Sequence, residues 1–223
     1  MSFHGFDRAA VELLRRLPSF DTEQYAAEKA RLKTGLVDPG GDLIEAVTTA
    51  LPADLTVVRR SSVSPLHRDL RFAKAGTPRY KDHLLLTAWE GTDKKSAPTL
   101  WVRIDADGVG FASGMGFDAG ARARWREAVG GKPGEAFTRA IARVSKGAKA
   151  GRCEIAGDLL KKVPSPWPAD HPREELLRMN AFQVRFMEPL PAQLEKPAFA
   201  SWCTTRLKRL LPVHAWLVEH VAG

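Results

Sequence analysis

The sequence predicts an α+β fold in a single domain, with a central antiparallel sheet flanked by N-terminal and C-terminal helices. Apolar residues recur at helical spacing near both ends of the chain. The middle holds β-rich runs that follow one another without an intervening helix, which argues against a doubly wound parallel sheet. The stiff stretch Val163–Pro168 could be a linker, but Trp167 favours a loop laid over the domain surface. We therefore expect residues 1–223 to form one domain.

The N-terminal part is expected to be helical. A first helix follows Asp7, a suitable N-cap, and carries its apolar residues at helical spacing. A second helix starts near residues 19–21 and runs through Leu32, and a third covers residues 43–51. Between them, Asp38-Pro39-Gly40-Gly41 has the composition of a turn.

The central part is expected to form the sheet. β-rich runs lie at residues 55–58, 83–89, 99–105 and 109–113. Asp107-Gly108 joins the last two runs, and Asp-Gly between two strand-like segments is a strong hairpin signal. Consecutive strands joined in this way predict antiparallel pairing.

Two helices, at about 118–129 and 133–146, should follow the sheet. In the second, Phe137, Ile141 and Val144 share one face, which we expect to pack on the sheet. A separate face carries three basic residues at the same spacing: Arg139, Arg143 and Lys146. We consider this basic face a weak candidate for a nucleic-acid interface.

The C-terminal part mixes both patterns. A short helix should follow Pro172, and residues 181–186 alternate apolar and polar side chains as a half-buried strand does. A final helix carries Phe199, Cys203 and Leu207 on one side. After Pro212 we expect only a last turn.

The net charge of +8 is unevenly distributed. Residues 120–152 include nine basic residues and only two acidic ones, Glu127 and Glu135. The basic residues are Arg122, Arg124, Arg126, Lys132, Arg139, Arg143, Lys146, Lys149 and Arg152. A concentrated basic surface favours a polyanionic partner such as nucleic acid. A solvated basic face without a partner remains an open alternative.

Other features narrow the function classes. No apolar run approaches the roughly 20 residues of a membrane helix, and the start lacks a signal peptide's pattern, so we expect a cytoplasmic protein without a membrane partner. Cys153 and Cys203 form no CxxC motif, and the chain has no P-loop or G-x-S-x-G motif. We expect no cofactor.

One segment, residues 64–83, concentrates chemically active side chains. If residues 68–72 are extended, Asp69 and Arg71 share a face and can pair, while Gly76-Thr77-Pro78 turns Lys81 back toward Lys74. Arginine forks with a lysine point charge suit phosphate or carboxylate recognition. The candidate ligand-binding set is Arg68, Arg71, Lys74, Tyr80 and Lys81.

The same cluster could instead be a buried Arg–Asp network that fixes a loop, and both interpretations stay open at this point. We expect a split, in which Arg71→Ala destabilises the fold and Lys81→Ala is near neutral. A structural network would instead make Arg68→Ala, Arg71→Ala and Lys81→Ala all strongly destabilising. A metal site could be formed by histidines and carboxylates of this region and a later one: His67, Asp69, Asp82, His83, Asp170 and His171. The surrounding arginines and lysines would repel a cation, so we expect no metal.

The segment Arg68-Asp69-Leu70-Arg71-Phe72-Ala73-Lys74, followed by Thr77-Pro78 and Tyr80-Lys81, resembles the signature of the bacterial and fungal family named domain of unknown function 2461. The resemblance extends over nearly the whole chain, including Lys161–Pro164 and Asp170-His171-Pro172. The chain departs from the signature at Ala73, at Ala75-Gly76 and at the inserted Arg79. The family supplies no activity, so the resemblance marks a location and not a reaction.

Three functions follow as hypotheses. The leading one is binding of a phosphate-bearing ligand, a nucleotide or nucleic acid, at the Arg/Lys cluster. The second is a cofactor-independent enzyme that acts on an anionic substrate, with Asp69 and His83 as acid–base groups. The third is a protein-interaction module in which the cluster is purely structural.

Overall fold

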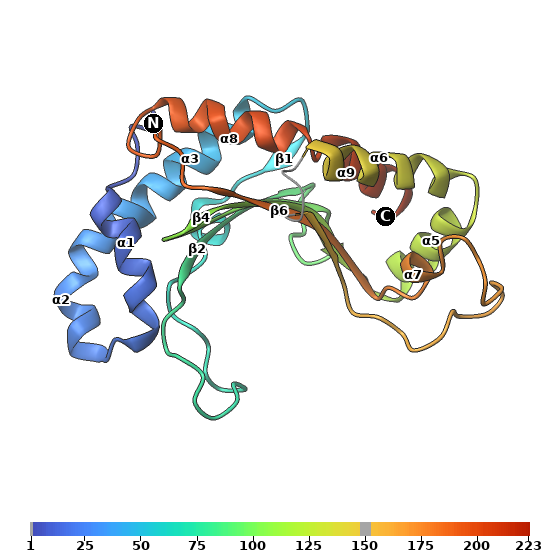
Figure 1. The fold of residues 1–223 in the computed structure, drawn as a ribbon, viewed down its shortest axis with the longest axis horizontal. Coiled ribbons are helices and arrows are strands. Elements are labelled where there is room, and N and C mark those ends of the chain that lie inside the picture. The colour runs from blue at the N-terminus through green and yellow to red at the C-terminus, as the bar shows by residue number, and fades with distance from the viewer. Residues whose placement is uncertain (1, 148–152) are drawn as a thin grey trace.

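The computed structural model describes residues 2–147 and 153–223 and shows an α+β domain built on one six-stranded antiparallel sheet (Figure 1). The strand order is β1-β2-β3-β4-β6-β5. The strands are β1 (Leu55–Thr56), β2 (His83–Glu90), β3 (Thr99–Asp105), β4 (Gly108–Gly116), β5 (Cys153–Ala156) and β6 (Ala181–Pro189). This confirms the predicted fold class.

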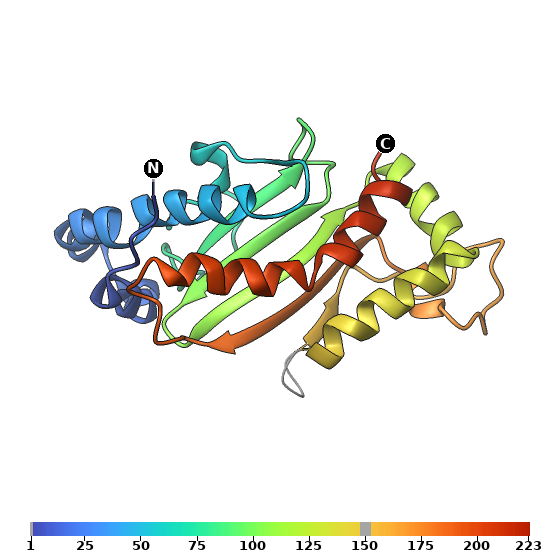
Figure 2. The same ribbon diagram turned by 90° about the horizontal axis from the view of Figure 1, so that it is seen from above.

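Helices cover one face of the sheet, and others extend beyond its two ends (Figures 1 and 2). The N-terminal helices are α1 (Arg8–Arg16), α2 (Thr22–Leu32), α3 (Asp38–Thr49) and the short α4 (Arg59–Ser62). The later helices are α5 (Ala119–Gly130), α6 (Pro133–Gly147), α7 (Glu174–Leu177), α8 (Ala198–Lys208) and α9 (Leu211–His220). Within the described chain, no helix is long and apolar enough to cross a membrane.

The core lies between these helices and the sheet. Alternate strand residues align in register across the strands, and one such row contains Leu86, Val102, Phe111 and Phe186, all fully buried. The predicted hairpin is present, since β3 and β4 pair on either side of Asp107. The Asp105 carboxylate accepts hydrogen bonds from the backbone N–H of Asp107 and of Gly108, which holds the turn.

The expected turn at Asp38–Gly41 is wrong, because these residues begin α3. Pro39 lies in the first turn of α3, and the carbonyl of Gly35, four residues before it, accepts from the Asp7 N–H. The glycines serve packing instead: a Cβ at Gly40 would lie 2.8 Å from Leu84 Cδ2 of β2. A π-helical segment, Lys33–Val37, joins α2 directly to α3.

Two other expectations need correction, and one strand was not expected. The last turn after Pro212 is the full helix α9, with Pro212 in its first turn. Strand β5 was not predicted, and its partly exposed residues lack the alternation that marks β6. The extended segment expected at residues 68–72 is wrong, because a turn at Arg71 and Phe72 interrupts it.

The amphipathic pattern of α6 is confirmed. Phe137, Ile141 and Val144 are buried, while Arg139, Arg143 and Lys146 are exposed. Lys149 and Arg152, which belong to the same basic stretch of sequence, lie outside the described residues.

Residues 64–82 form a long arm that precedes β2, and this segment carries the cluster singled out above. The arm projects from the sheet on the side opposite to α6 and α8, next to α2 (Figure 1). It starts at the edge of β2, where Val63 bridges Leu86 and Ser64 N–H donates to Leu85 O at 2.9 Å.

Candidate functional site

The arm has a paired base and an open tip. At the base, Arg68 N–H donates to Arg79 O at 2.9 Å, and Lys81 N–H donates to Leu66 O at 2.8 Å. These two hydrogen bonds flank the bridge between His67 and Tyr80. We call residues 66–68 with 79–81 the base, and residues 69–78 the tip. Lys81 therefore lies beside Leu66 and Arg68, and the expected approach of Lys81 to Lys74 is wrong.

Three rings lock the base of the arm against α2. The Tyr25 and Tyr80 rings stack with their centroids 4.2 Å apart. His67 packs edge-on against both, at 4.7 Å from Tyr25 and 5.0 Å from Tyr80. Tyr80 is thereby only 1% exposed, so this member of the predicted binding set holds the arm in place. Burial, with a smaller contribution from Tyr80, raises the pKa of Tyr25 and keeps its hydroxyl protonated.

Arg68 and Lys81 are two cations held close together at this base. Burial, and then the charge of Arg68, lower the pKa of Lys81. The Nε of Arg68 is buried without a hydrogen-bond partner. Neither side chain forms an ion pair within the described residues. The base thus holds positive charge that the described part of the chain leaves uncompensated.

The tip is different, because its charged pair is exposed. Arg71 Nη2 lies 2.6 Å from Asp69 Oδ2, and Arg71 Nε donates to the same carboxylate, which confirms the predicted pairing. Hydrogen bonds from Arg71 lower the pKa of Asp69. Lys74 is exposed, and Phe72 is 93% exposed. The buried Arg–Asp network considered above is therefore not present in the tip.

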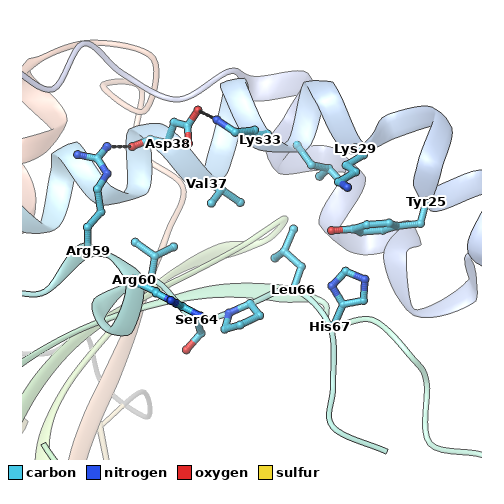
Figure 3. Close-up of a pocket in the computed structure, with 13 residues that line it drawn as sticks. Tyr25, Lys29, Lys33, Val37, Asp38, Arg59, Arg60, Ser64, Leu66 and His67 are labelled. Atoms are coloured by element: carbon cyan, nitrogen blue, oxygen red, sulfur yellow. Dashed lines mark hydrogen bonds and ion pairs between the residues drawn. The ribbon is translucent and has the colours of Figure 1, made fainter.

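A cavity of about 590 Å³ lies between α2 and the base of the arm (Figure 3). Its walls are largely apolar, including Leu32, Val37, Val63 and Leu66. Tyr25 and His67 close one end. Its volume falls in the range of roughly 300–1,000 Å³ that is usual for small-molecule sites.

Basic side chains surround this cavity. Lys33 is paired with Asp38, and Arg59 is held by Asp42 and Glu45, so these two are already compensated. Lys29 and Arg60 line the same cavity, are exposed, and have no acidic partner within the described ranges. The site therefore combines an apolar interior with cations that no carboxylate neutralises.

The two residues of the proposed acid–base pair each have another partner. His83 Nδ1 lies 2.6 Å from Asp82 Oδ1, and Arg103 approaches the same carboxylate at 3.6 Å. Burial would raise the pKa of Asp82, but His83 and Arg103 outweigh it and lower it. Burial lowers the pKa of His83 and outweighs the hydrogen bond that His83 makes to the Asp82 carboxylate. Asp69 is held by Arg71, so Asp69 and His83 do not form a dyad.

Other candidates give no assembled site. Residues 2–147 and 153–223 contain no group of three or more His, Cys, Asp or Glu side chains that could hold a metal ion. Cys153 and Cys203 are free thiols, and burial raises the pKa of Cys203. The basic face of α6 is exposed, with Arg139 only 3.9 Å from Glu135, and lies across the sheet from the arm (Figure 1).

The sequence did not point to Tyr25, Lys29 or Arg60 as site residues. The cavity is lined from two stretches of the chain, residues 25–38 and residues 59–67, and only folding brings them together. A weak signal was available for Lys29, since it lies one helical turn after Tyr25 and so on the same face of α2.

The comparisons with known proteins support the resemblance noted in the arm. No curated protein matches this chain. The sequence model of the family described as "Conserved hypothetical protein (DUF2461)" matches residues 12–216, which include α2, the arm, the whole sheet and most of the later helices. With the greater part of its length matched and the signature cations at the base of its arm, the chain belongs to the DUF2461 family.

Proposed function

We propose that this protein binds a phosphate-bearing ligand where the base of the arm meets the cavity against α2. The observation that carries the proposal is the pair Arg68 and Lys81, two neighbouring cations without an acidic partner in the described chain. Like charges held together are unfavourable in the empty site, and an anion between them removes that cost.

The chemistry of the two side chains fits phosphate. A guanidinium can donate two parallel hydrogen bonds to phosphate oxygens, and a lysine adds a compact charge. The unpartnered Arg68 Nε would gain an acceptor on binding. Neither Arg68 nor Lys81 lines the cavity against α2, but Leu66 and His67 of the same base do. The apolar walls of that cavity and the exposed Lys29 suit the apolar or aromatic body of a ligand whose anionic end the two cations bind.

The members of the predicted binding set then have different roles. Arg68 and Lys81 contact the ligand in this proposal, and Tyr80 positions the base of the arm. Arg71 and Lys74, on the tip, are not needed for a small ligand. The acid–base and protein-interaction hypotheses stay predictions, and neither gains an observation of comparable weight.

Calorimetric titration tests the proposal with inorganic tripolyphosphate, a nucleoside triphosphate and the matching nucleoside. We expect the two phosphate-bearing probes to bind and the nucleoside to bind at least tenfold more weakly. Lys81→Met should weaken both phosphate probes about tenfold, which corresponds to one charge-assisted contact of roughly 1.4 kcal/mol. The fold should not suffer, because burial already disfavours the charged form of Lys81.

Lys208→Met is the matched control, because Lys208 is exposed at the end of α8 and its loss removes the same charge. The control should leave the affinity unchanged. If both variants bind the phosphate probes equally weakly, the loss of affinity comes from the lower net charge and not from a contact at Lys81. Tight binding of the unphosphorylated nucleoside would also contradict the proposal.

A further inference from the structure

The tip of the arm exposes an aromatic ring that has no role in the fold. Phe72 is 93% exposed, and Leu70 beside it is 39% exposed. The tip projects into solvent from the sheet (Figure 1). The Arg71 guanidinium carbon lies 6.0 Å from the centre of the Phe72 ring, so the neighbouring cation leaves most of the ring surface open.

The ring lies among cations along both strands of the arm. From His67 to Lys81 the chain carries five basic residues against the single acid Asp69; they are Arg68, Arg71, Lys74, Arg79 and Lys81. Asp69 is already occupied by Arg71. The arm is thus a narrow basic element with an exposed aromatic ring between its charges.

We propose that the arm binds single-stranded nucleic acid, with a base stacked on Phe72 and phosphates held by the cations of the tip and the base. The proposal rests on the function proposed above, because it takes Arg68 and Lys81 to hold phosphate. Aromatic rings interleaved with basic side chains are the usual means of binding a single strand without sequence preference.

The dimensions of the arm favour a polymer over a flat charged surface. Leu70 is the last residue before the turn at Arg71 and Phe72, and it follows His67 by three residues. At ~3.3 Å per residue the turn lies up to about 10 Å from the base. A lipid surface that touches the tip would leave the base beyond the screening length of about 8 Å at physiological salt. A flexible strand with a charge on every nucleotide can reach both.

Stacking also selects unpaired bases. The bases of a duplex are already stacked on one another, so a protruding phenylalanine gains little from them unless the helix opens. The proposal therefore distinguishes single strands from duplex of the same sequence. It also distinguishes Phe72 from the exposed arginines of α6, whose charge attracts phosphates of single strands and duplex alike.

The experiment measures fluorescence anisotropy of a labelled oligothymidine of about 12 nucleotides, within the ~4–16 nucleotides that a site of this type covers. We expect Phe72→Ala to weaken binding about tenfold and Phe72→Trp to retain it. An abasic oligomer of the same length keeps the phosphates but lacks the bases. It should bind wild type and Phe72→Ala equally.

Tripolyphosphate titration separates the two proposals. Phe72→Ala should bind tripolyphosphate as wild type does, since Phe72 lies outside the base. The single-strand inference is overturned if the affinity for oligothymidine does not depend on Phe72. It is also overturned if the protein binds duplex as tightly as the single strand. Either result leaves the proposed function intact. Failure of wild type to bind tripolyphosphate overturns the proposed function.

Vesicles supply the remaining comparison. Cosedimentation with phosphatidylserine-containing vesicles that depends on Phe72, without Phe72-dependent binding of oligothymidine, overturns the inference in favour of a lipid surface. The inference is supported if oligothymidine binding depends on Phe72 and vesicle binding does not.

Discussion

Two arginine–carboxylate clusters, one at the tip of the arm and one beneath α8, use the same residue types in different surroundings. At the tip, Arg71 and Asp69 pair while both stay largely in water. Beneath α8, Glu188 of β6 accepts hydrogen bonds from Arg206 and from Arg209, at 3.0 Å each. The Glu188 side chain is only 16% exposed. The comparison therefore predicts that breaking the buried cluster lowers the stability of the fold more than breaking the exposed pair does.

Aromatic contacts strengthen the cluster beneath α8. The Arg206 guanidinium lies 4.0 Å from the ring centre of Trp202, and Arg209 lies 5.3 Å from that of Phe186. Glu188 therefore joins β6 to the C-terminal end of α8 through two arginines that are themselves packed on rings. At the tip, the ring near the Arg71 guanidinium is that of Phe72, which is itself exposed.

The largest expected effect is therefore at Glu188. Glu188→Ala leaves two partly buried guanidiniums without an acceptor and should lower the free energy of unfolding by about 2–3 kcal/mol, somewhat below the ~3–5 kcal/mol of a fully buried pair. Urea unfolding measures it. If Glu188→Ala lowers the free energy of unfolding no more than an exposed surface substitution does, the two clusters do not differ in their contribution to stability.

A buried histidine provides an intermediate test. His214 of α9 is 2% exposed, and its Nε2 lies 3.1 Å from Glu90 Oε2. Burial lowers the pKa of His214 and outweighs the opposing hydrogen bond with Glu90. The unfolded chain therefore binds more protons between this lowered pKa and the ordinary value near 6.5.

Stability should accordingly fall as the pH drops below about 6.5, because protonation then favours the unfolded chain. His214→Gln keeps a donor for Glu90 but cannot titrate, so its stability should fall less steeply over the same range. His83, whose pKa burial also lowers, should account for part of the slope that remains. Thermal unfolding at a series of pH values compares the slopes, and identical slopes would remove His214 as a cause.

The smallest expected effect is at the tip. Arg71→Ala should leave the urea midpoint unchanged within error, because water solvates the exposed Asp69 carboxylate once its partner is gone. This replaces the destabilisation expected from the sequence, which assumed that the pair was part of a strand. A clear loss of stability would show that the tip is folded more tightly than its exposure implies.

The sequence predicted the parts of this fold that depend on local patterns. The alternation in residues 99–105 and the Asp-Gly turn predicted the β3–β4 hairpin, and the spacing of Phe137, Ile141 and Val144 predicted the buried face of α6. Asp69 and Arg71 pair as predicted, although a turn at Arg71 replaces the extended segment on which that prediction rested. Each of these features is decided within a few residues.

The features that the sequence did not predict depend on contacts between residues far apart in the chain. Asp38-Pro39-Gly40-Gly41 is helical because Gly40 lets α3 approach Leu84, and nothing in the local composition shows that contact. His214 meets Glu90 across 124 positions of the chain. The cavity combines α2 with the arm, which Tyr25 and Tyr80 hold together. Such features follow from tertiary packing and not from periodicity.

The shape of the arm has a consequence for proteases. Beyond the hydrogen bond between Arg68 and Arg79, the tip backbone is held only by short contacts such as Thr77 N–H to Lys74 O at 3.1 Å. Trypsin cleaves after basic residues, and Arg71 and Lys74 both lie on this exposed loop, where nicking is favoured. The two fragments would stay together, since α3 packs on β2 and Val63 bridges Leu86 across the cut. The arm can thus be severed at its tip while the sheet beneath it remains assembled.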